Sequence, residues 1–586
     1  MDYCQWHKWC LKQSNPTLDW VVMNITIRRA LVGGIAGAIA SIGLIPTFTM
    51  PLPALLIGVV FGIFVCLLLN GQHELLDGML TAAALGIPLW LVINVIALPL
   101  LNGEPAQWTN TGLQVAFPAL VGWVLYGLVL GALFPPLTWV FNRIFGPIII
   151  AIPTKPEIKT RIVVLGGGFA GATTAQHLEQ AFGADPTVSL TLISESNALL
   201  FTPMLAEVAA SSLEPTHISS PLRTSLRRTQ VVRARVESVD LPQRYVRLAG
   251  EDGAPARELP FDHLVLSLGA VSNYFGNKNI EQVAFDFKSL GDAIKIRNHM
   301  IKMFERAEIE PDAARRKQLL TFVIAGAGFS GAELAGGLND FSRGMLADYP
   351  NIQPDDVAVI AISPSNRILP ELSDNLARYA LERMRARGVQ FQLNTRVADA
   401  APGTVTVTSA KMANTTIAAN TLVWTAGTRP SPVLDTLPTT IERNKRGSVI
   451  VNAQLAVPNH PGLWAVGDCA AVTDAHGHAC PPTAQFALRE GYTLAHNIHA
   501  SVHGKPLKPF HFQAMGILAV IGHHAACAEL RMPIINKTLR FSGLLAWLMW
   551  RGIYWVKLPG LERKVRVLSD WLIELFFPRD IVQTID

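Results

Sequence analysis

The sequence predicts an α/β protein preceded by an all-α transmembrane domain of about four helices. Three observations lead to this fold class. Half of the 586 residues are hydrophobic and only 16% are charged, against about 25% in ordinary soluble domains, and the charge deficit lies near the N-terminus. A glycine-rich turn between a short apolar strand and a helix begins near residue 161. The same pattern returns near residue 321, so the rest of the chain contains two copies of one α/β unit.

Residues 28–152 are predicted to form the transmembrane domain. Few charged residues occur between Ala30 and Thr154, and four apolar runs there are long enough, or nearly so, to span a bilayer. These runs lie near residues 30–48, 53–70, 79–101 and 114–141. The first run is rich in glycine, which permits close helix packing. Residues 1–27 form a polar N-terminal segment without the pattern of a signal peptide.

The basic residues predict that both ends of this domain face the cytoplasm. Arg28 and Arg29 precede the first run and Arg143 follows the last, whereas residues 102–111 contain no lysine or arginine. We therefore expect a multi-pass protein of the cell (inner) membrane, with its soluble part on the cytoplasmic side. The runs carry no charged residue at mid-membrane depth, so the domain is interpreted as an anchor rather than a pump. Asn94 is interpreted as a helix-packing residue.

The first glycine-rich turn has the spacing of a dinucleotide-binding site. A buried strand over 162–165 leads into the turn and a helix is predicted over 172–180; the three glycines are Gly166, Gly168 and Gly171. The first glycine permits the turn, the second lets the backbone approach a pyrophosphate, and the third lets the helix pack on the strand. The helix N-terminus favours the pyrophosphate charge. Glu195, after a second strand over 188–193, is placed to accept both ribose hydroxyls of an adenosine.

The second turn repeats the first about 160 residues later, at Gly326, Gly328 and Gly331, and indicates a second dinucleotide. A strand over 357–362 should be followed by the acid that holds an NADH ribose, but the chain has Ser363 there and Arg367 nearby. Loss of the carboxylate removes repulsion toward a 2′-phosphate. Arg367 either pairs with that phosphate or is an ordinary surface arginine, so the choice between NADH and NADPH stays open.

Further strands are predicted around the two turns. One is expected over 231–239 and another over 245–248. A strand over 262–269 ends in glycine, as expected where backbone passes close to a cofactor. The strand Leu422–Gly427 should bring the chain back toward the first unit.

The composition excludes several functions. The net charge of +5 is modest, and no basic stripe with interleaved aromatics occurs, so nucleic-acid binding is not expected. The six cysteines form no C-x-x-C, which argues against a disulfide framework, a structural zinc site and a dithiol active site. Cys4, His7 and Cys10 lie close together near the N-terminus and are interpreted as a non-functional group. No metal site is predicted.

From Arg161 to the C-terminus the chain resembles the two-dinucleotide flavoproteins, in particular the type II NADH dehydrogenases, which are single-chain NADH:quinone oxidoreductases. The motifs that carry the resemblance are Gly166–Gly171 with Glu195, Gly326–Glu333, Leu463–Ala470 and Pro481–Gly491. The resemblance implies two Rossmann-like domains that bind FAD and NADH or NADPH. It also implies hydride transfer to FAD and transfer of two electrons to a membrane quinone, without ion pumping.

The resemblance also assigns candidate site residues. It implies catalytic roles for Glu333, close to the flavin and nicotinamide, and for Gln485, beside the flavin and quinone. It implies cofactor contacts for Gly166, Gly168, Phe169, Ala170, Gly171, Glu195, Gly326, Gly328, Gly331, Gly427, Gly467, Asp468, Ala484 and Gln485. It implies quinone contacts for Gln485, Ala487 and Arg489, although glutamine is usual in the family where this chain has Arg489.

The implied domains are a first FAD-binding part over 158–317, an NAD(P)H-binding domain over 318–430, a second FAD-binding part with the quinone element over 431–535, and a membrane-associating region over 536–586. The four N-terminal runs lie outside the family's usual extent. The alternative function is a membrane-anchored, FAD-binding redox sensor or assembly factor with little turnover. The oligomeric state stays open, with a homodimer as one arrangement.

The C-terminal region is interpreted as an amphipathic helix that lies on the bilayer. Aromatic residues stand among leucines with two cations nearby, at Trp547, Trp550, Arg551, Tyr554, Trp555 and Lys557. Aromatic rings with snorkelling cations suit a membrane interface, from which a quinone enters. The alternative is an ordinary buried helix that packs on the flavin domain.

Overall fold

The computed structural model describes residues 16–42, 44, 51–68, 75–106, 110–145, 157–183, 185–250, 255–410, 412–474, 477–532 and 537–583. The chain forms two compact units, Met1–Lys155 and Pro156–Asp586. The expected group of Cys4, His7 and Cys10 lies outside the described residues.

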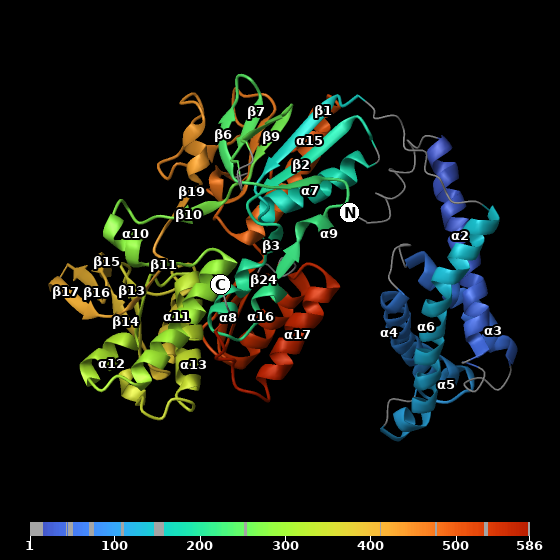
Figure 1. The fold of residues 1–586 in the computed structure, drawn as a ribbon, viewed down its shortest axis with the longest axis horizontal. Helices are drawn as coiled ribbons and strands as arrows, with labels where there is room; N and C mark the ends of the chain where they lie inside the picture. Colours follow the sequence, from blue (N-terminus) through green and yellow to red (C-terminus); the bar gives the residue numbers. More distant parts are fainter. Residues whose placement is uncertain are drawn as a thin grey trace. The chain divides into compact units, whose positions relative to one another are not determined.

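The first unit is helical. Its elements are α2 (Pro16–Ala40), α3 (Pro51–Leu68), α4 (Leu75–Trp90), the π-helical η2 (Leu91–Ala97), α5 (Leu98–Leu101) and α6 (Asn110–Phe145) (Figure 1). The first helix begins at Pro16, earlier than the apolar run predicted, because proline suits a first helical turn and the polar residues after it continue the helix. Within the described ranges, two segments are long and apolar enough to cross a membrane, Gly78–Leu101 and Val115–Phe141, and Leu52–Cys66 is shorter. The expected count of four spans is therefore not confirmed.

Close helix contacts hold this unit together. A Cβ added to Gly37 of α2 would lie 2.2 Å from the carbonyl oxygen of Gly58 in α3, so the two backbones touch as the glycine-rich run predicted. The indole N–H of Trp123 donates to Asn94 Oδ1 at 2.7 Å. This hydrogen bond confirms Asn94 as a helix-packing residue.

The second unit contains two parallel five-stranded sheets. The first sheet has the order β21-β9-β1-β2-β5. Its strands are β1 (Thr160–Leu165), β2 (Val188–Ser194), β5 (Gln230–Arg233), β9 (His263–Leu266) and β21 (Leu463–Ala465). Helices α7 (Phe169–Phe182) and α15 (Ala484–Val502) pack side by side beside it. The central strands are buried, as their continuous apolar sequences require in a parallel sheet.

The second sheet repeats this arrangement with the order β11-β18-β12-β13-β14. Its strands are β11 (Phe285–Asp286), β12 (Thr321–Ala325), β13 (Ala358–Ser363), β14 (Val389–Leu393) and β18 (Thr421–Trp424). The helices around it are α11 (Leu290–Glu308), α12 (Ala313–Leu319), α13 (Phe329–Met345) and α14 (Asp374–Ala386). Strands β12 and β13 occupy the places that β1 and β2 have in the first sheet.

Two antiparallel strands connect the sheets. Strand β10 (Ala270–Ser272) pairs with β19 (Thr428–Pro430), which confirms that the chain returns to the first sheet after Gly427. Two antiparallel three-stranded sheets are attached, β6 (Val236–Asp240), β7 (Tyr245–Leu248) and β8 (Arg257–Pro260), and β15 (Thr395–Ala401), β16 (Thr404–Ser409) and β17 (Met412–Ala418).

The single strand predicted over 231–239 is wrong. Strand β5 belongs to the parallel sheet and ends at Arg233, and β6 begins a different sheet at Val236. Short elements complete the unit: β3 (Ala198–Leu200), η3 (Thr202–Met204), α8 (Leu205–Ala209), η4 (Pro215–Ile218), β4 (Ser219–Pro221), α9 (Leu222–Ser225), α10 (Lys278–Val283), η5 (Pro354–Asp356), η6 (Pro432–Thr436), β20 (Val449–Ile450), η7 (Gly467–Cys469) and β22 (Ala470–Ala471).

The C-terminal module is an antiparallel sheet followed by two helices. It contains β23 (Gly516–Val520), β24 (Ala526–Met532), β25 (Lys537–Ser542), α16 (Gly543–Lys557) and α17 (Leu561–Glu574). Trp547 and Trp550 are 6% and 2% exposed. The Arg551 guanidinium lies 4.0 Å from the Trp547 ring centroid and 4.6 Å from that of Trp571.

The interpretation of these aromatic residues and Arg551 as the bilayer contact is therefore wrong. Large rings remove the most apolar area from water when they pack inward, and Arg551 packs with them instead of snorkelling. The exposed side of the two helices carries Lys557, Glu562 and Arg566 and a larger number of aliphatic residues, namely Leu544, Leu545, Leu548, Val556, Leu561, Val565, Leu568, Leu572 and Ile573.

Candidate dinucleotide and quinone site

The two glycine-rich turns are built alike. Gly166 has φ +106° and Gly326 has φ +111°, a backbone conformation that favours glycine. The N–H of Gly166 donates to the carbonyl of Ile193, and the N–H of Gly326 donates to that of Ile362, both at 2.8 Å. The first turn is thereby fixed to β2, and the second turn to β13.

The remaining glycines leave the same opening in each glycine-rich turn. A Cβ on Gly171 would lie 1.9 Å from the Gly166 carbonyl oxygen, and a Cβ on Gly331 would lie 2.1 Å from the Gly326 carbonyl oxygen. In contrast, a Cβ on Gly168 or Gly328 would meet nothing within 4 Å. These two residues cap α7 and α13 without a side-chain hydrogen bond to the helix. Open space before uncapped backbone N–H groups fits a pyrophosphate in both units.

The strand register places the missing acid one residue later than the sequence analysis did. Because Ile193 and Ile362 accept equivalent hydrogen bonds, Ser363 corresponds to Ser194, and Pro364 corresponds to Glu195. Glu195 and Pro364 are both exposed, directly after their strands. The residue at the place of the predicted ribose-binding acid is thus Pro364.

Arg367 is held by its own loop. Its guanidinium pairs with Asp374 and donates to the carbonyls of Pro370, at 2.6 Å, and Leu372. These contacts favour the surface-arginine interpretation over a 2′-phosphate ligand.

The predicted ribityl-binding motif reaches the first turn. Gly467 has φ +72°, and a Cβ there would lie 3.1 Å from the Ala170 side chain. The N–H of Gly467 donates to Glu490 Oε2 at 2.7 Å. Burial raises the pKa of Asp468, and the nearby Lys288 ammonium opposes that rise. Sequence reasoning missed both Glu490 and Lys288, and no motif marks the lysine.

The predicted catalytic residues hold the two ends of one strand. Gln485 donates from Nε2 to the Gly516 carbonyl and accepts the Met515 N–H, both at 3.1 Å. Glu333 Oε1 accepts the N–H of Val520 at 3.2 Å. Strand β23 therefore connects the start of α15 with the start of α13, an arrangement that the sequence did not reveal.

Glu333 is a proton-binding group at neutral pH. Burial raises its pKa to about 8, although the Val520 N–H opposes the rise. A row of ring contacts lies between the first turn and the C-terminal module. The Phe169 ring centroid is 5.8 Å from that of Phe201, which is 6.0 Å from that of Tyr554. Burial raises the pKa of the Tyr554 hydroxyl, and the nearby Glu333 carboxylate adds to the rise.

The structure separates the predicted quinone ligands. Ala484, a predicted cofactor contact, is the first residue of α15, and the predicted quinone contacts Ala487 and Arg489 lie further along this helix. Ala487 is 6% exposed and lines a cavity of about 600 Å³ together with Asp468 and Glu490. Arg489 is exposed, with its guanidinium 5.5 Å from the Phe512 ring centroid. A cavity of this volume is within the range of cofactor sites.

The remaining predicted cofactor residue, Gly427, lies at the crossing between the sheets. A Cβ there would lie 2.7 Å from the Phe275 ring, so only glycine fits without a shift. Within the described ranges, no group of three or more histidine, cysteine, aspartate or glutamate residues is arranged to hold a metal ion.

Comparison with known proteins gives one consistent result. The family described as pyridine nucleotide-disulphide oxidoreductase matches residues 160–497, and the NDH2 C-terminal domain matches residues 515–580. A type II NADH:quinone oxidoreductase of Mycobacterium tuberculosis is 30% identical over 72% of this chain and 90% of its own length. An external alternative NADH-ubiquinone oxidoreductase of Yarrowia lipolytica mitochondria is 28% identical over 73% of this chain and 81% of its own length.

The fold is also similar to that of a solved structure. A structure of NDH2 from Plasmodium falciparum in complex with NADH superposes with a TM-score of 0.67 at 19% identity. The match covers 72% of this chain and all of that structure.

Proposed function

Since the chain belongs to the family of type II NADH:quinone oxidoreductases, we propose that it passes two electrons from NADH through bound FAD to a membrane quinone without pumping ions. The observation that supports this most strongly is the pair of equivalent open turns, one in each sheet. FAD, when bound, supplies hydride acceptance and electron transfer to the quinone. The protein's residues bind and orient the reactants.

The first sheet and the elements beside it are the proposed FAD site. Gly168 leaves room for the pyrophosphate at α7, and Glu195 is placed for the ribose hydroxyls. Asp468 is proposed to hold the ribityl chain, with Lys288 balancing its charge. We assign residues 158–317 and 431–535 to this domain.

The second sheet, within 318–430, is the proposed NADH site. Gly328 provides the opening for the pyrophosphate. NADH is the expected reductant because the Arg367 guanidinium pairs with Asp374 and a carbonyl of its own loop rather than with a 2′-phosphate. The proline at 364 supplies no carboxylate, so we expect the preference for NADH over NADPH to be modest.

Glu333 and Gln485 are the proposed residues at the reacting rings. With a pKa of about 8, Glu333 carries a proton at neutral pH and can donate it or form a hydrogen bond. Gln485 and Glu333 both form hydrogen bonds to the backbone of β23, so this strand sets the distance between them. Ala487 and Arg489 are less direct candidates for quinone contact, since one is buried and the other exposed.

The aliphatic face of α16 and α17 is proposed to lie in the cytoplasmic leaflet of the cell membrane. Leu545, Leu548 and Leu568 belong to this face and are exposed, and an apolar surface of this kind suits a quinone that arrives from lipid. The helical first unit is proposed as a multi-pass anchor with about four spans. A homodimer is a further proposal.

Turnover of the purified full-length protein in lipid vesicles tests this function. We expect NADH-dependent reduction of a soluble quinone and no acidification of the vesicle interior. Tight FAD binding without quinone reduction would contradict it. That result would favour the redox sensor or assembly factor, which the family relationship does not favour.

A further inference from the structure

A small cavity beside Glu333 is lined by charged groups that the proposed reaction does not use. Its volume is about 40 Å³, and Glu333, Glu207, Arg551 and His523 are among its lining residues. An open pocket of about 330 Å³ shares three lining residues with it, namely Asp340, His523 and Arg579. The shared residues form a thin wall between Glu333's cavity and an open pocket.

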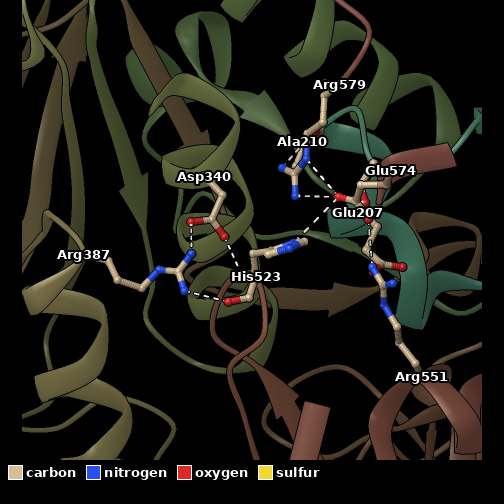
Figure 2. A network of polar contacts seen from close by, with 9 residues as sticks. Glu207, Ala210, Asp340, Arg387, His523, Arg551, Glu574 and Arg579 are labelled. Carbon is tan, nitrogen blue, oxygen red and sulfur yellow. Dashed lines mark hydrogen bonds and ion pairs between the residues drawn. The ribbon is translucent and has the colours of Figure 1, made fainter. Parts of the chain in front are cut away.

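Glu207 lines the small cavity and Glu574 lines the open pocket, and these two carboxylates have different partners (Figure 2). Glu574 accepts hydrogen bonds from Arg551 and Arg579, both at 2.9 Å, and from Ser212 at 2.8 Å. Glu207 lies 3.8 Å from Arg551 Nη2, too far for a hydrogen bond. The arginines lower the pKa of Glu574, whereas burial raises that of Glu207 to about 7. Glu574 therefore stays ionised while Glu207 can take up and release a proton.

Water is the natural occupant of this cavity. Among the described residues, three buried atoms that belong to its lining have no hydrogen-bond partner: Glu207 Oε2, Arg551 Nε and Trp550 Nε1. Trp550 is only 2% exposed, so its N–H has no access to bulk solvent. A polar cavity of about 40 Å³ has room for at least one water, which needs two to four polar partners. Water in this cavity would supply the hydrogen-bond partners that these atoms lack.

We propose that Glu207 and this water form a proton relay between His523 at the open pocket and Glu333. The proposal rests on the proposed function, whose stoichiometry requires such a supply. Reduction of a quinone to a quinol consumes two electrons and two protons, and the hydride of NADH carries two electrons and one proton. One further proton per turnover must therefore come from solvent. Glu333 receives it from Glu207, and Glu207 is reprotonated through His523.

The charged groups around the relay suit repeated protonation. Glu207 is faced by Arg551 of α16, Glu574 of α17, Arg579 of the C-terminal tail and Glu333 of α13. His523 is faced by His524, Glu574, Arg579 and Asp340. The positive charges of Arg551 and Arg579 outweigh the negative charge of Glu574. Glu207 can therefore hold a negative charge briefly after it gives up its proton. Glu207 therefore passes protons to Glu333 and contacts no substrate.

The main test is E207Q in the FAD-loaded, full-length protein. Glu207 and Glu490 both have a pKa of about 7, so the infrared carbonyl absorption that titrates near pH 7 in the unmodified protein should lose the Glu207 band in E207Q and the Glu490 band in E490Q. We expect kcat for NADH:quinone turnover to fall at least about tenfold. In the unmodified protein kcat should decline above about pH 7, where Glu207 loses its proton, and this decline should be absent in E207Q.

The matched control is E529Q on β24. Glu529 is also a poorly exposed carboxylate of the C-terminal module, but it accepts hydrogen bonds from Ser373 and Arg540 and lines neither space. Its loss should leave both infrared bands and the pH profile unchanged. A uniform fall of kcat in E207Q with the Glu207 band retained, or an unchanged pH profile, would overturn the relay.

H523A provides a second measurement that does not depend on the folding of E207Q. Added imidazole can enter the open pocket of about 330 Å³ and should restore most of the lost turnover in H523A but none in E207Q. Failure of imidazole to restore H523A would overturn the proposal. Absence of NADH:quinone turnover in the unmodified protein would instead contradict the proposed function, and loss or retention of the Glu207 infrared band would still decide the protonation of Glu207.

Discussion

The two dinucleotide-binding units share one backbone turn and differ at the residue after the second strand. Their first glycines have φ values of +106° and +111°, and their second glycines face open space. Glu195 follows β2, whereas Pro364 occupies the equivalent place after β13. The comparison separates two tasks. In the proposed assignment the turn recognises the pyrophosphate common to both nucleotides, and the residue after β2 or β13 sets the preference for the ribose.

Valine at the second glycine should give the largest effect, and a different one in each unit. A Cβ at Gly168 or Gly328 meets no protein atom within 4 Å, so we expect G168V and G328V to fold. G168V should weaken FAD binding about a hundredfold or more, because the blocked pyrophosphate loses charge-assisted hydrogen bonds worth about 1.5–3 kcal/mol each. G328V should keep its FAD and lose NADH binding. Flavin absorbance of the purified proteins and NADH titration measure the two effects.

Loss of Glu195 in the first dinucleotide-binding unit should weaken FAD binding selectively. E195Q should raise the dissociation constant for FAD roughly tenfold, because a neutral amide is a weaker acceptor for ribose hydroxyls than a carboxylate. Titration of the apoprotein with FAD, followed by fluorescence quenching, measures this change. S194A, one residue earlier and buried in β2, is the control. Equal FAD affinity in E195Q and the unmodified protein would show that Glu195 does not contact the ribose.

Introduction of an acid after β13 in the second dinucleotide-binding unit should increase the preference for NADH over NADPH. P364E should increase the ratio of kcat/KM for NADH to that for NADPH by about tenfold, because a carboxylate beside the 2′-phosphate is repulsive. S363E, one residue earlier and buried at the end of β13, should instead destabilise the protein. A shift in preference with S363E and none with P364E would return the ribose-binding position to Ser363.

The buried acid near the first turn should affect stability more than turnover. Burial raises the pKa of Glu490 from 4.5 to about 7. Between these pH values the folded protein binds a proton that the unfolded chain has released, so stability falls as pH rises through this window. E490Q should raise Tm by a few degrees at pH 8 and leave it nearly unchanged at pH 4.5. Calorimetry across this range measures the difference, and a gain of equal size at both pH values would contradict the assignment.

The sequence predicted the elements whose signal is local. The glycine spacing located both turns and the strands before them, and the register of the two parallel sheets follows from those turns. The glycines of the two turns could be located for the same reason, whereas Gly467 and Asp468 were named only through the family resemblance. The acid position was displaced by one residue because a buried serine ends both second strands.

Other features depend on packing that no local pattern encodes. The aromatic residues of α16 suggested a bilayer contact, but Trp547 and Trp550 pack inward around Arg551, and leucines occupy the exposed face. The switch from β5 to β6 was hidden because an apolar run continues across two sheets. Glu207 and Lys288 come from segments far from the motifs, and only the fold brings them to the site.

Anaerobic stopped-flow spectroscopy tests the assignment of one nucleotide to each unit most directly. The unmodified, FAD-loaded protein is mixed first with NADH and then with a soluble quinone, and G328V is treated in the same way. The assignment predicts rapid bleaching of the flavin by NADH and recovery with quinone in the unmodified protein, and no bleaching by NADH in G328V despite a full complement of FAD. Rapid bleaching in G328V, or none in the unmodified protein, would contradict it.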